Sequence, residues 1–460
     1  MNSYQRLVSN TALFAISSFS SKVLVFLLVP FYTRVLSPAD YGTAELLVQT
    51  GALLLPLASV GIGSAVVRFS LERGSDKRCV FTVGLLCNLF GLGVLLLAAP
   101  LLGKLSSLTP YTTWLLLFVI ASNLHGLCSQ FIRTLGHVRL FALDGLLRTV
   151  LTVVFNVLLL KVFRCGVAGY VLANVASDAL SALFLFFRAG LARYVSVSAL
   201  RGTTAAEMLR YCVPLIPNTV FSWIISLSDR YFINLMVGSS ANGIYALANK
   251  IPAALVLVAT VFASAWELTA LSERPRAERE RFFSNVFGVY QAAVFVVGSA
   301  LILTAQIAIR MLSTPEFYGA WRYVPVLVLA TVFSCLSAFL TSLYMLEKRS
   351  VANLAITAAG AVLNVVGNLL LIPRWGAMGA AVSTLASYAL LFAVRAVHTR
   401  GILRIRWSVP RFLLSLALLS AQCLLIGCGA PHWPAWAAFC FLAVLALHYK
   451  WLLRALQKAI

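Results

Sequence analysis

Acidic residues are scarce in this sequence, and charge of either sign is uncommon. Aspartate and glutamate together number 14 in 460 residues, and all charged residues make up 11% of the chain, whereas about a quarter of a soluble protein is charged. Hydrophobic residues make up 61%, and the mean hydropathy is +0.93. This composition excludes an ordinary soluble domain and indicates an integral membrane protein.

Motifs for metal or redox chemistry are also missing. The nine cysteines lie mostly inside apolar runs, with no CxxC pair and no cluster with histidine. They are typical of small core residues rather than of disulfides or metal ligands. We therefore expect no metal site and no cofactor, apart from a coupling ion such as Na⁺ or H⁺.

Long hydrophilic loops are absent as well. The longest connections, at 188–207 and 267–282, are too short to form a separate soluble domain. A membrane-bound polymerase or ligase needs a sizeable outer loop to carry its catalytic groups. We therefore do not expect an enzyme.

Apolar runs of about 20 residues, the length that crosses the hydrocarbon core, recur along the chain. The run VGLLCNLFGLGVLLLAAPLL at 83–102 is apolar on every face, unlike the alternating strands of a membrane barrel. Arg6 precedes the first run without a compact signal-peptide pattern, so that run is expected to remain as a helix. The predicted fold class is an all-α polytopic membrane protein with 14 transmembrane helices, at 8–34, 42–67, 80–102, 112–132, 141–163, 167–187, 208–236, 242–266, 283–311, 322–345, 351–372, 377–397, 410–428 and 434–453.

The formal net charge of +22 at first suggests nucleic acid as a partner. Basic residues of a membrane protein, however, usually gather in cytoplasmic loops, where they meet anionic lipid. If both termini are cytoplasmic, most of the 36 Lys and Arg residues lie on that side. The positive-inside rule therefore favours cytoplasmic termini. We expect membrane lipids, and not nucleic acid, as the partners of the basic residues.

Two pairs of similar turns indicate an internal repeat. The segment FNVLLLKVFRCGVAGYV at 155–171 resembles GNLLLIPRWGAMGAAV at 367–382, and VLSPADYGTAEL at 35–46 aligns with MVGSSANGIYAL at 236–247. The offsets of the two pairs agree closely, although short loops between spans favour Gly, Pro and Ser in any case. We predict two pseudo-symmetric six-helix lobes, at 1–200 and 201–405, followed by two extra helices at 406–460.

Some ionisable residues lie inside the predicted spans, where a charge costs at least a few kcal/mol unless it meets a cavity or a partner. We expect the cations to give a central cavity between the lobes a positive potential. These cations are Lys22, Arg34, Arg148, Arg230 and Lys250. The acidic residues are candidates for coupling or pairing, and they are Glu45, Asp178 and Asp229. Glu45 is alternatively a structural partner of Arg34, whereas Lys22 and Arg148 lack a local partner and are the clearer cavity candidates.

Prolines concentrate in the first, second, seventh and eighth spans. They are Pro30, Pro56, Pro214, Pro217 and Pro252. A proline frees a backbone carbonyl and bends a helix, so these four helices are candidates for gates. The alternative is that proline is simply tolerated in spanning helices, and Pro325 in the tenth span shows that the clustering is incomplete.

Several of these segments resemble a known family. They are FLLVPFYTRVLSPADYGTAELL at 26–47, LLPLASVGIGSAVVRFSLE at 54–72, DRYFINLMVGSSANGIYALANKI at 229–251 and NLLLIPRWGAMGAAVSTLAS at 368–387. They are similar to polysaccharide flippases of the O-antigen (Wzx) type, in the multidrug/oligosaccharidyl-lipid/polysaccharide (MOP) exporter superfamily. The resemblance covers both halves of the chain, whereas the spans between these motifs are not specific.

The resemblance implies two six-helix lobes around a cation-rich cavity, in a bacterial cytoplasmic (inner) membrane. It also implies translocation of an undecaprenyl-diphosphate-linked oligosaccharide, which is an O-antigen, capsule or exopolysaccharide repeat unit, from the inner to the outer leaflet by alternating access. Association with polysaccharide assembly proteins is a further expectation. Intramembrane Lys and Arg suit a diphosphate. The alternative is an ion-coupled multidrug or organic-cation antiporter of the related branch, with Asp178 and Asp229 as candidate coupling carboxylates.

Overall fold

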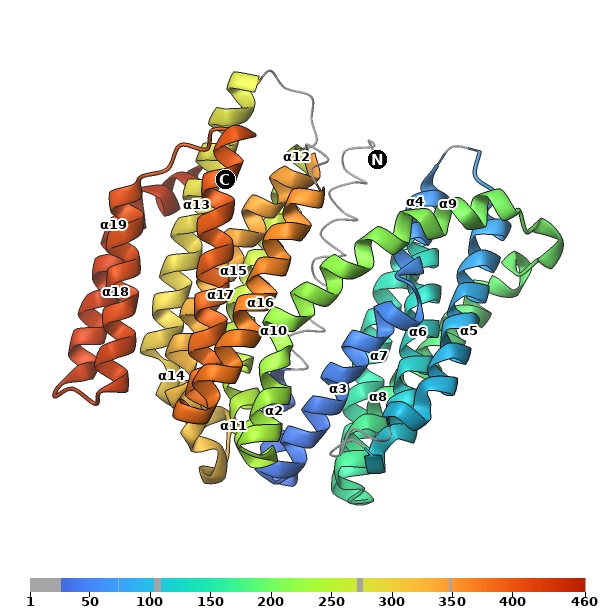
Figure 1. Ribbon diagram of the computed structural model, residues 1–460, viewed down its shortest axis with the longest axis horizontal. Helices are drawn as coiled ribbons and strands as arrows, with labels where there is room; N and C mark the ends of the chain where they lie inside the picture. The colour runs from blue at the N-terminus through green and yellow to red at the C-terminus, as the bar shows by residue number, and fades with distance from the viewer. Residues whose placement is uncertain (1–25, 73, 103–108, 271–275, 347–349, 460) are drawn as a thin grey trace. The chain divides into compact units, whose positions relative to one another are not determined.

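Every element in the described part of the chain is helical (Figure 1). The computed structural model describes residues 26–72, 74–102, 109–270, 276–346 and 350–459. No strand occurs among these residues. The all-α fold class predicted from the sequence is therefore confirmed.

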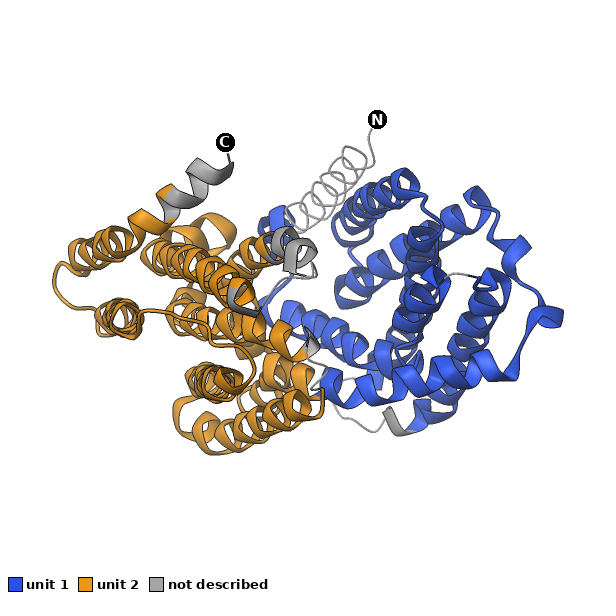
Figure 2. Cartoon of the chain, turned by 90° about the horizontal axis from the view of Figure 1, so that it is seen from above, with its two compact units in different colours: residues 1–220 blue, residues 221–460 orange. Residues whose placement is uncertain are grey.

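The chain forms two compact units, residues 1–220 and 221–460 (Figure 2). The helices of the first unit are α2 (Val29–Val35), α3 (Pro38–Ala58), α4 (Ile62–Leu71), α5 (Lys77–Leu102), α6 (Thr112–Thr134), α7 (Val138–Asn156), α8 (Gly166–Arg188) and α9 (Gly202–Cys212). A π-helical turn, η2 (Val157–Val162), continues α7, and the short helix η3 (Leu191–Tyr194) follows α8. The boundary between the units falls inside α10 (Ile216–Met236).

The remaining helices belong to the second unit. They are α11 (Ser239–Ala248), α12 (Lys250–Ala270), α13 (Arg276–Leu303), α14 (Ala305–Leu312), α15 (Val324–Leu346), α16 (Ser350–Trp375), α17 (Ala377–His398), α18 (Val409–Gly427) and α19 (Trp433–Ala459). The last two pack against α13, within the same compact unit. The finer division into 1–200, 201–405 and 406–460 stays a prediction.

In the described residues, 11 helical segments are long and apolar enough to cross a membrane, and the bent pair α3–α4 raises the number to 12. These segments correspond to the second to thirteenth predicted spans. Helix α19 covers the fourteenth predicted span but is not among the 12, and most of the first lies outside the described residues. The count of 14 is consistent with this arrangement and stays a prediction.

The segment at 35–46 contains the junction between α2 and α3, and α3 begins at Pro38, four residues before the predicted start of the second span. Ser37 is the N-cap of α3, and its hydroxyl oxygen accepts a hydrogen bond from the backbone N–H of Asp40 at 3.2 Å, while Pro38 occupies the first helical turn. Ser, Asp and Pro are the residues that favour such a helix start. The aligned turn at 236–247 also leads into a helix, α11, but its N-cap is Gly238 with a φ of +118°. The two turns therefore occupy corresponding positions before a helix, but different residues cap the two helices.

The five prolines singled out in the sequence lie at helix ends and breaks. Pro30 is in the first turn of α2, Pro56 is in the last turn of α3, and Pro214 is in the short helix η5 (Val213–Leu215). Pro217 and Pro252 lie in the first turns of α10 and α12. The α3–α4 pair bends by 51° directly after Pro56. A bend therefore follows Pro56, whereas a gating role for these prolines stays a prediction.

The first glycine of each GxxG motif in the predicted repeat has a positive φ. Gly166 and Gly376 both have left-handed backbone angles, with φ of +53° and +56°, which glycine adopts without steric cost. A Cβ placed on Gly169 would lie 3.2 Å from the carbonyl oxygen of Leu159, and one on Gly379 would clash with the carbonyl group of Leu371. In both units the first glycine makes the turn, and the second lets the new helix approach the backbone of the preceding one.

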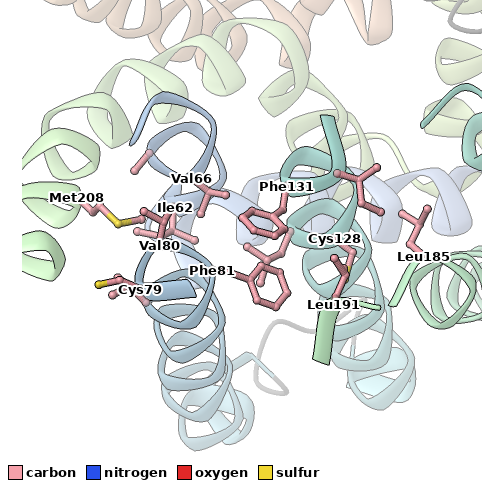
Figure 3. Packing of buried hydrophobic residues seen from close by; sticks show 14 of the residues in the cluster. Ile62, Val66, Cys79, Val80, Phe81, Cys128, Phe131, Leu185, Leu191 and Met208 are labelled. Atoms are coloured by element: carbon pink, nitrogen blue, oxygen red, sulfur yellow. The ribbon is translucent and has the colours of Figure 1, made fainter. Parts of the chain in front are cut away.

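A buried apolar cluster holds the first unit together at one end (Figure 3). It joins α4, α5, α6, α8 and α9 through side chains that include Ile62, Val66, Phe81, Phe131, Leu185 and Met208. The rings of Phe81 and Phe131 are 4.6 Å apart between centroids. Close packing of this kind is the main attraction between helices in a membrane.

Candidate functional site

Helices α6, α7 and α8 each contribute two polar side chains to a buried network inside the first unit. These six residues are Ser122 and His125 from α6, Asp144 and Arg148 from α7, and Asp178 and Ser181 from α8. On each helix the two positions are three or four residues apart, so they lie on one face. The network consists of two layers, which are one helical turn apart.

The first layer is centred on Asp144. One carboxylate oxygen accepts a hydrogen bond from the hydroxyl of Ser181, and Nε2 of His125 lies 3.0 Å from the other. The side chain of Asp144 is 3% exposed, and that of His125 is 11% exposed. Hydrogen bonds from two neighbouring helices therefore compensate the cost of burying this carboxyl group.

The second layer is centred on Asp178, whose side chain is 1% exposed. Its carboxylate accepts hydrogen bonds from the Ser122 hydroxyl and from Nε of Arg148. The partner of Arg148 is therefore not local, as the sequence indicated, but comes from the next helix. The Arg148 side chain is nevertheless 44% exposed.

The terminal nitrogens of Arg148 are the part of this network that can meet a ligand. The guanidinium donates to Asp178 through Nε alone, and neither terminal nitrogen donates to another described residue. A guanidinium has five N–H donors in a planar fork that fits carboxylate and phosphate groups. The arrangement leaves most of these donors available while the buried carboxylate fixes the position of the group.

Glu45 does not pair with Arg34, which corrects the structural alternative considered above. Arg34 is exposed in the last turn of α2, whereas Glu45 is 2% exposed and accepts a hydrogen bond from the hydroxyl of Tyr170 at 2.9 Å. The rings of Tyr32 and Tyr41 pack against Tyr170, with centroid distances of 4.9 and 6.5 Å. Helix α8 thus holds Glu45 through an aromatic cluster, and Arg34 stays separate from it.

The second unit has its own acidic centre at Asp229 of α10. This side chain accepts hydrogen bonds from the Tyr245 hydroxyl at 2.6 Å and from the backbone N–H of Arg230 at 2.9 Å. Both Asp229 and Arg230 are buried, with 2% and 5% exposure. Because adjacent residues on a helix point about 100° apart, the two side chains enter the protein interior in different directions.

Amide and hydroxyl groups form a network across the neighbouring helices of the second unit. Ser228 donates to Oδ1 of Asn364 at 3.2 Å, and Asn368 donates to the same oxygen at 3.1 Å. Nδ2 of Asn364 donates to Thr384 at 3.3 Å. The network links α10, α16 and α17 at buried positions.

Of the other two predicted cations, the structure describes Lys250 but not Lys22. Lys250 is the first residue of α12 and is partly buried, at the break that follows α11. Lys22 lies outside the described residues.

Arg395, near the end of the predicted span 377–397, is a buried cation that was not among the predicted cavity cations. It is 6% exposed in α17, and it donates to Ser337 at 2.7 Å and to Asn353 and Thr357 at 2.9 Å. No carboxylate forms an ion pair with it among the residues that the structure describes. A position at the end of an apolar run is typical of a solvated loop. The one sequence signal for a buried polar site is the spacing of Asn353 and Thr357, which places both on one face of α16.

The fold is similar to those of solved transporters. The lipid II flippase MurJ in an inward closed conformation has a TM-score of 0.73 and 12% identity, with 97% of this chain and 99% of that chain covered. An inward-facing multidrug resistance MATE family transporter of the MOP superfamily has a TM-score of 0.68 and 13% identity, over 84% and 98% of the two chains. A MOP superfamily transporter from Pyrococcus furiosus has a TM-score of 0.60 and 13% identity, over 85% and 96%. At these identities, the similarities establish the fold alone.

Sequence comparison identifies the family. No curated protein matches this chain. The family model described as "Polysaccharide biosynthesis protein" matches residues 7–266, which is more than half of the chain and includes both the α6–α8 network and the aligned turn at 236–247. The chain therefore belongs to this polysaccharide biosynthesis protein family of the MOP superfamily.

Proposed function

We propose that this protein is a flippase that translocates an undecaprenyl-diphosphate-linked oligosaccharide from the inner to the outer leaflet of a bacterial cytoplasmic membrane. The oligosaccharide is the repeat unit of an O-antigen, a capsule or an exopolysaccharide, and transport proceeds by alternating access without enzymatic chemistry. Membership of a polysaccharide biosynthesis family supports this proposal. The similarity of fold to a lipid II flippase agrees with it.

The observation that carries the proposal is the position of Arg148. A cation within a spanning segment is costly, and it is retained where it serves a partner or a ligand. Arg148 has a structural partner in Asp178, yet 44% of its side chain is exposed and its terminal nitrogens remain available. A diphosphate, which presents several anionic oxygens, is the group of the proposed substrate that such a fork binds best.

Coupling to an ion gradient is the second part of the proposal. Asp178 is already bound by Arg148 and Ser122, so it is the weaker of the two predicted coupling carboxylates. Asp229 is buried and accepts hydrogen bonds from the Tyr245 hydroxyl and from a backbone N–H, neither of which is a charged donor. We therefore assign coupling by Na⁺ or H⁺ to Asp229, and we place both termini on the cytoplasmic side.

The proposal is tested with purified protein in proteoliposomes that contain labelled undecaprenyl-diphosphate oligosaccharide. The expected result is that the protein increases the fraction of the sugar on the opposite leaflet, measured with a membrane-impermeant sugar-modifying enzyme. Arg148→Ala should remove this activity, whereas Arg201→Ala, which changes an exposed arginine on the predicted cytoplasmic side, should retain it. Sugar translocation equal to that of protein-free liposomes would contradict the proposal.

The alternative function is an ion-coupled antiporter for drugs or organic cations. The observation in its favour is the set of buried carboxylates, Asp144, Asp178 and Asp229, together with the fold similarity to multidrug MATE transporters. Two of the three carboxylates already bind a histidine or an arginine, which leaves little acidic surface for a cationic drug. Efflux of a fluorescent organic cation from the same proteoliposomes, without movement of the sugar, would establish the alternative.

A further inference from the structure

A cavity of about 760 Å³ lies at one end of the first unit, and none of the six residues of the α6–α8 network lines it. Its walls are the turn that joins α6 to α7, the last residues of α8 and the start of η3. Three arginines line it, namely Arg139, Arg188 and Arg193. The positive-inside rule places this end of the helices at the cytoplasmic surface of the membrane.

The positive charge of this cavity has no acidic counterpart. No aspartate or glutamate lines it, and Arg139 and Arg188 form no ion pair with any residue that the structure describes. The guanidinium of Arg193 lies 5.1 Å from the centre of the Tyr194 ring, a contact that leaves its charge in place. Three guanidinium groups around one cavity create a local positive potential that favours an anion.

The start of α7 adds further donors to the cavity. The N-cap residue His137 makes no side-chain cap hydrogen bond, and His137, Val138 and Leu140 line the cavity with Arg139. The first backbone N–H groups of a helix have no partner within the helix. These groups supplement the arginines, which provide most of the charge.

Two apolar stripes lead away from the cavity. On α7 the exposed residues Leu143, Leu146, Val150 and Val154 have exposures of 52%, 42%, 55% and 44%, and on α8 the residues Phe187, Leu183 and Leu180 have exposures of 75%, 51% and 42%. Each set follows a helical spacing of three or four residues, so each forms one stripe on its helix. Leu143 and Phe187 also line the cavity, and the two stripes therefore begin at the basic cavity itself.

We propose that this basic pocket binds the phosphate headgroup of an anionic phospholipid from the cytoplasmic leaflet, with the acyl chains along the α7 and α8 stripes. The positive arginines complement the negative phosphate of the headgroup, and the apolar stripes suit the apolar acyl chains. The lipid is a bound partner of the protein rather than its transported substrate. The proposal does not depend on the proposed function, because it concerns another site and another ligand.

The experiment measures lipid binding to the full chain in detergent by native mass spectrometry, with phosphatidylglycerol and phosphatidylcholine of identical acyl chains. We expect bound phosphatidylglycerol and little phosphatidylcholine. Replacing two pocket arginines together, Arg139→Gln with Arg188→Gln, should weaken phosphatidylglycerol binding by about tenfold or more, because each charge-assisted hydrogen bond that is lost contributes on this scale. The control, Arg201→Gln with Arg210→Gln, removes equal charge from exposed positions outside the pocket and should leave binding unchanged.

A further pair of variants tests the apolar stripes. Leu143→Ala with Phe187→Ala should weaken binding of phosphatidylglycerol while leaving binding of glycerophosphoglycerol, the headgroup without chains, unaltered. Unchanged thermal unfolding of all variants in phosphatidylcholine nanodiscs verifies the fold. Equal binding of the two lipids, or full binding by the pocket variant, would overturn the proposal. Binding of undecaprenyl diphosphate but not of phosphatidylglycerol at this pocket would also overturn it.

Discussion

Arg148 donates a hydrogen bond from Nε to the carboxylate of Asp178, a residue 30 positions later on the neighbouring helix α8. Asp178 is fully buried, whereas almost half of the Arg148 side chain is exposed. The pair thus has one end in the protein interior and one end that can meet a ligand. We therefore expect Arg148 both to stabilise the fold through Asp178 and to bind the ligand through its exposed nitrogens.

The Arg148–Asp178 pair should contribute to both stability and transport. Arg148→Ala should lower the free energy of unfolding by about 1–3 kcal/mol, because it leaves the buried Asp178 without its charged partner. It should also abolish sugar translocation. The double change Arg148→Ala with Asp178→Ala removes the unpaired carboxylate, so it should recover most of the stability but none of the translocation. Recovery of translocation in the double variant would reduce Arg148 to a structural role.

The hydrogen bonds around Asp144 should stabilise the folded protein. Ser181→Ala removes a hydroxyl that donates to the buried Asp144, and it should lower the free energy of unfolding by about 1–3 kcal/mol. Ser64→Ala, at an exposed position of the same unit, should have little effect. Thermal unfolding in detergent measures both, and equal melting temperatures would show that the Ser181 hydrogen bond contributes nothing.

The second glycine of each GxxG motif should not tolerate a methyl group. Gly379→Ala places a Cβ against the carbonyl group of Leu371, and overpacking of this kind costs about 1–3 kcal/mol. Gly169→Ala should cost less, because its nearest neighbours are at 2.9 and 3.2 Å. Gly427→Ala is the control, since it has no neighbour within 4 Å. Folded yield and melting temperature measure the series, and a neutral Gly379→Ala would contradict the packing described for α17.

Arg395 should require the shape of its side chain as well as its charge. Its terminal nitrogens donate to three neutral side chains on α15 and α16, and the ammonium of lysine cannot reproduce that fork. Arg395→Lys should therefore lower the melting temperature, with a loss of about 1–3 kcal/mol from buried groups left unsatisfied. Arg400→Lys, at an exposed position nearby in the sequence, serves as the matched control. Identical unfolding of the two variants would contradict this role.

Asp229 should determine the coupling of transport to an ion gradient. Asp229→Asn keeps the size of the side chain but removes its charge, so translocation should no longer respond to an imposed Na⁺ or H⁺ gradient. Glu316→Gln, at an exposed position of the second unit, should respond like the unchanged protein. The measurement compares the initial rates of translocation with and without each gradient. A gradient response in Asp229→Asn would exclude this residue as the coupling group.

The sequence was sufficient for the architecture because membrane physics leaves few choices. Long apolar runs must be helices in a bilayer, since the backbone has no other way to satisfy its hydrogen bonds there. Local signals also mark where some helices begin, as with Ser37 and Pro38 at the start of α3, and the positive φ of Gly166 and Gly376 at the starts of α8 and α17. These features depend on neighbouring residues only, so they can be read from the chain.

The identity of each buried partner was decided by the tertiary structure. Arg148 with Asp178, His125 with Asp144 and Glu45 with Tyr170 all join different helices, and helical spacing gives the face of one helix but not its neighbour. For the same reason the sequence could not predict that Glu45 binds Tyr170 instead of Arg34, or that Arg395 is buried among neutral side chains. The sequence by itself determined a helical membrane protein with polar groups inside, and only the packing of α6, α7 and α8 decided which of those groups bind one another.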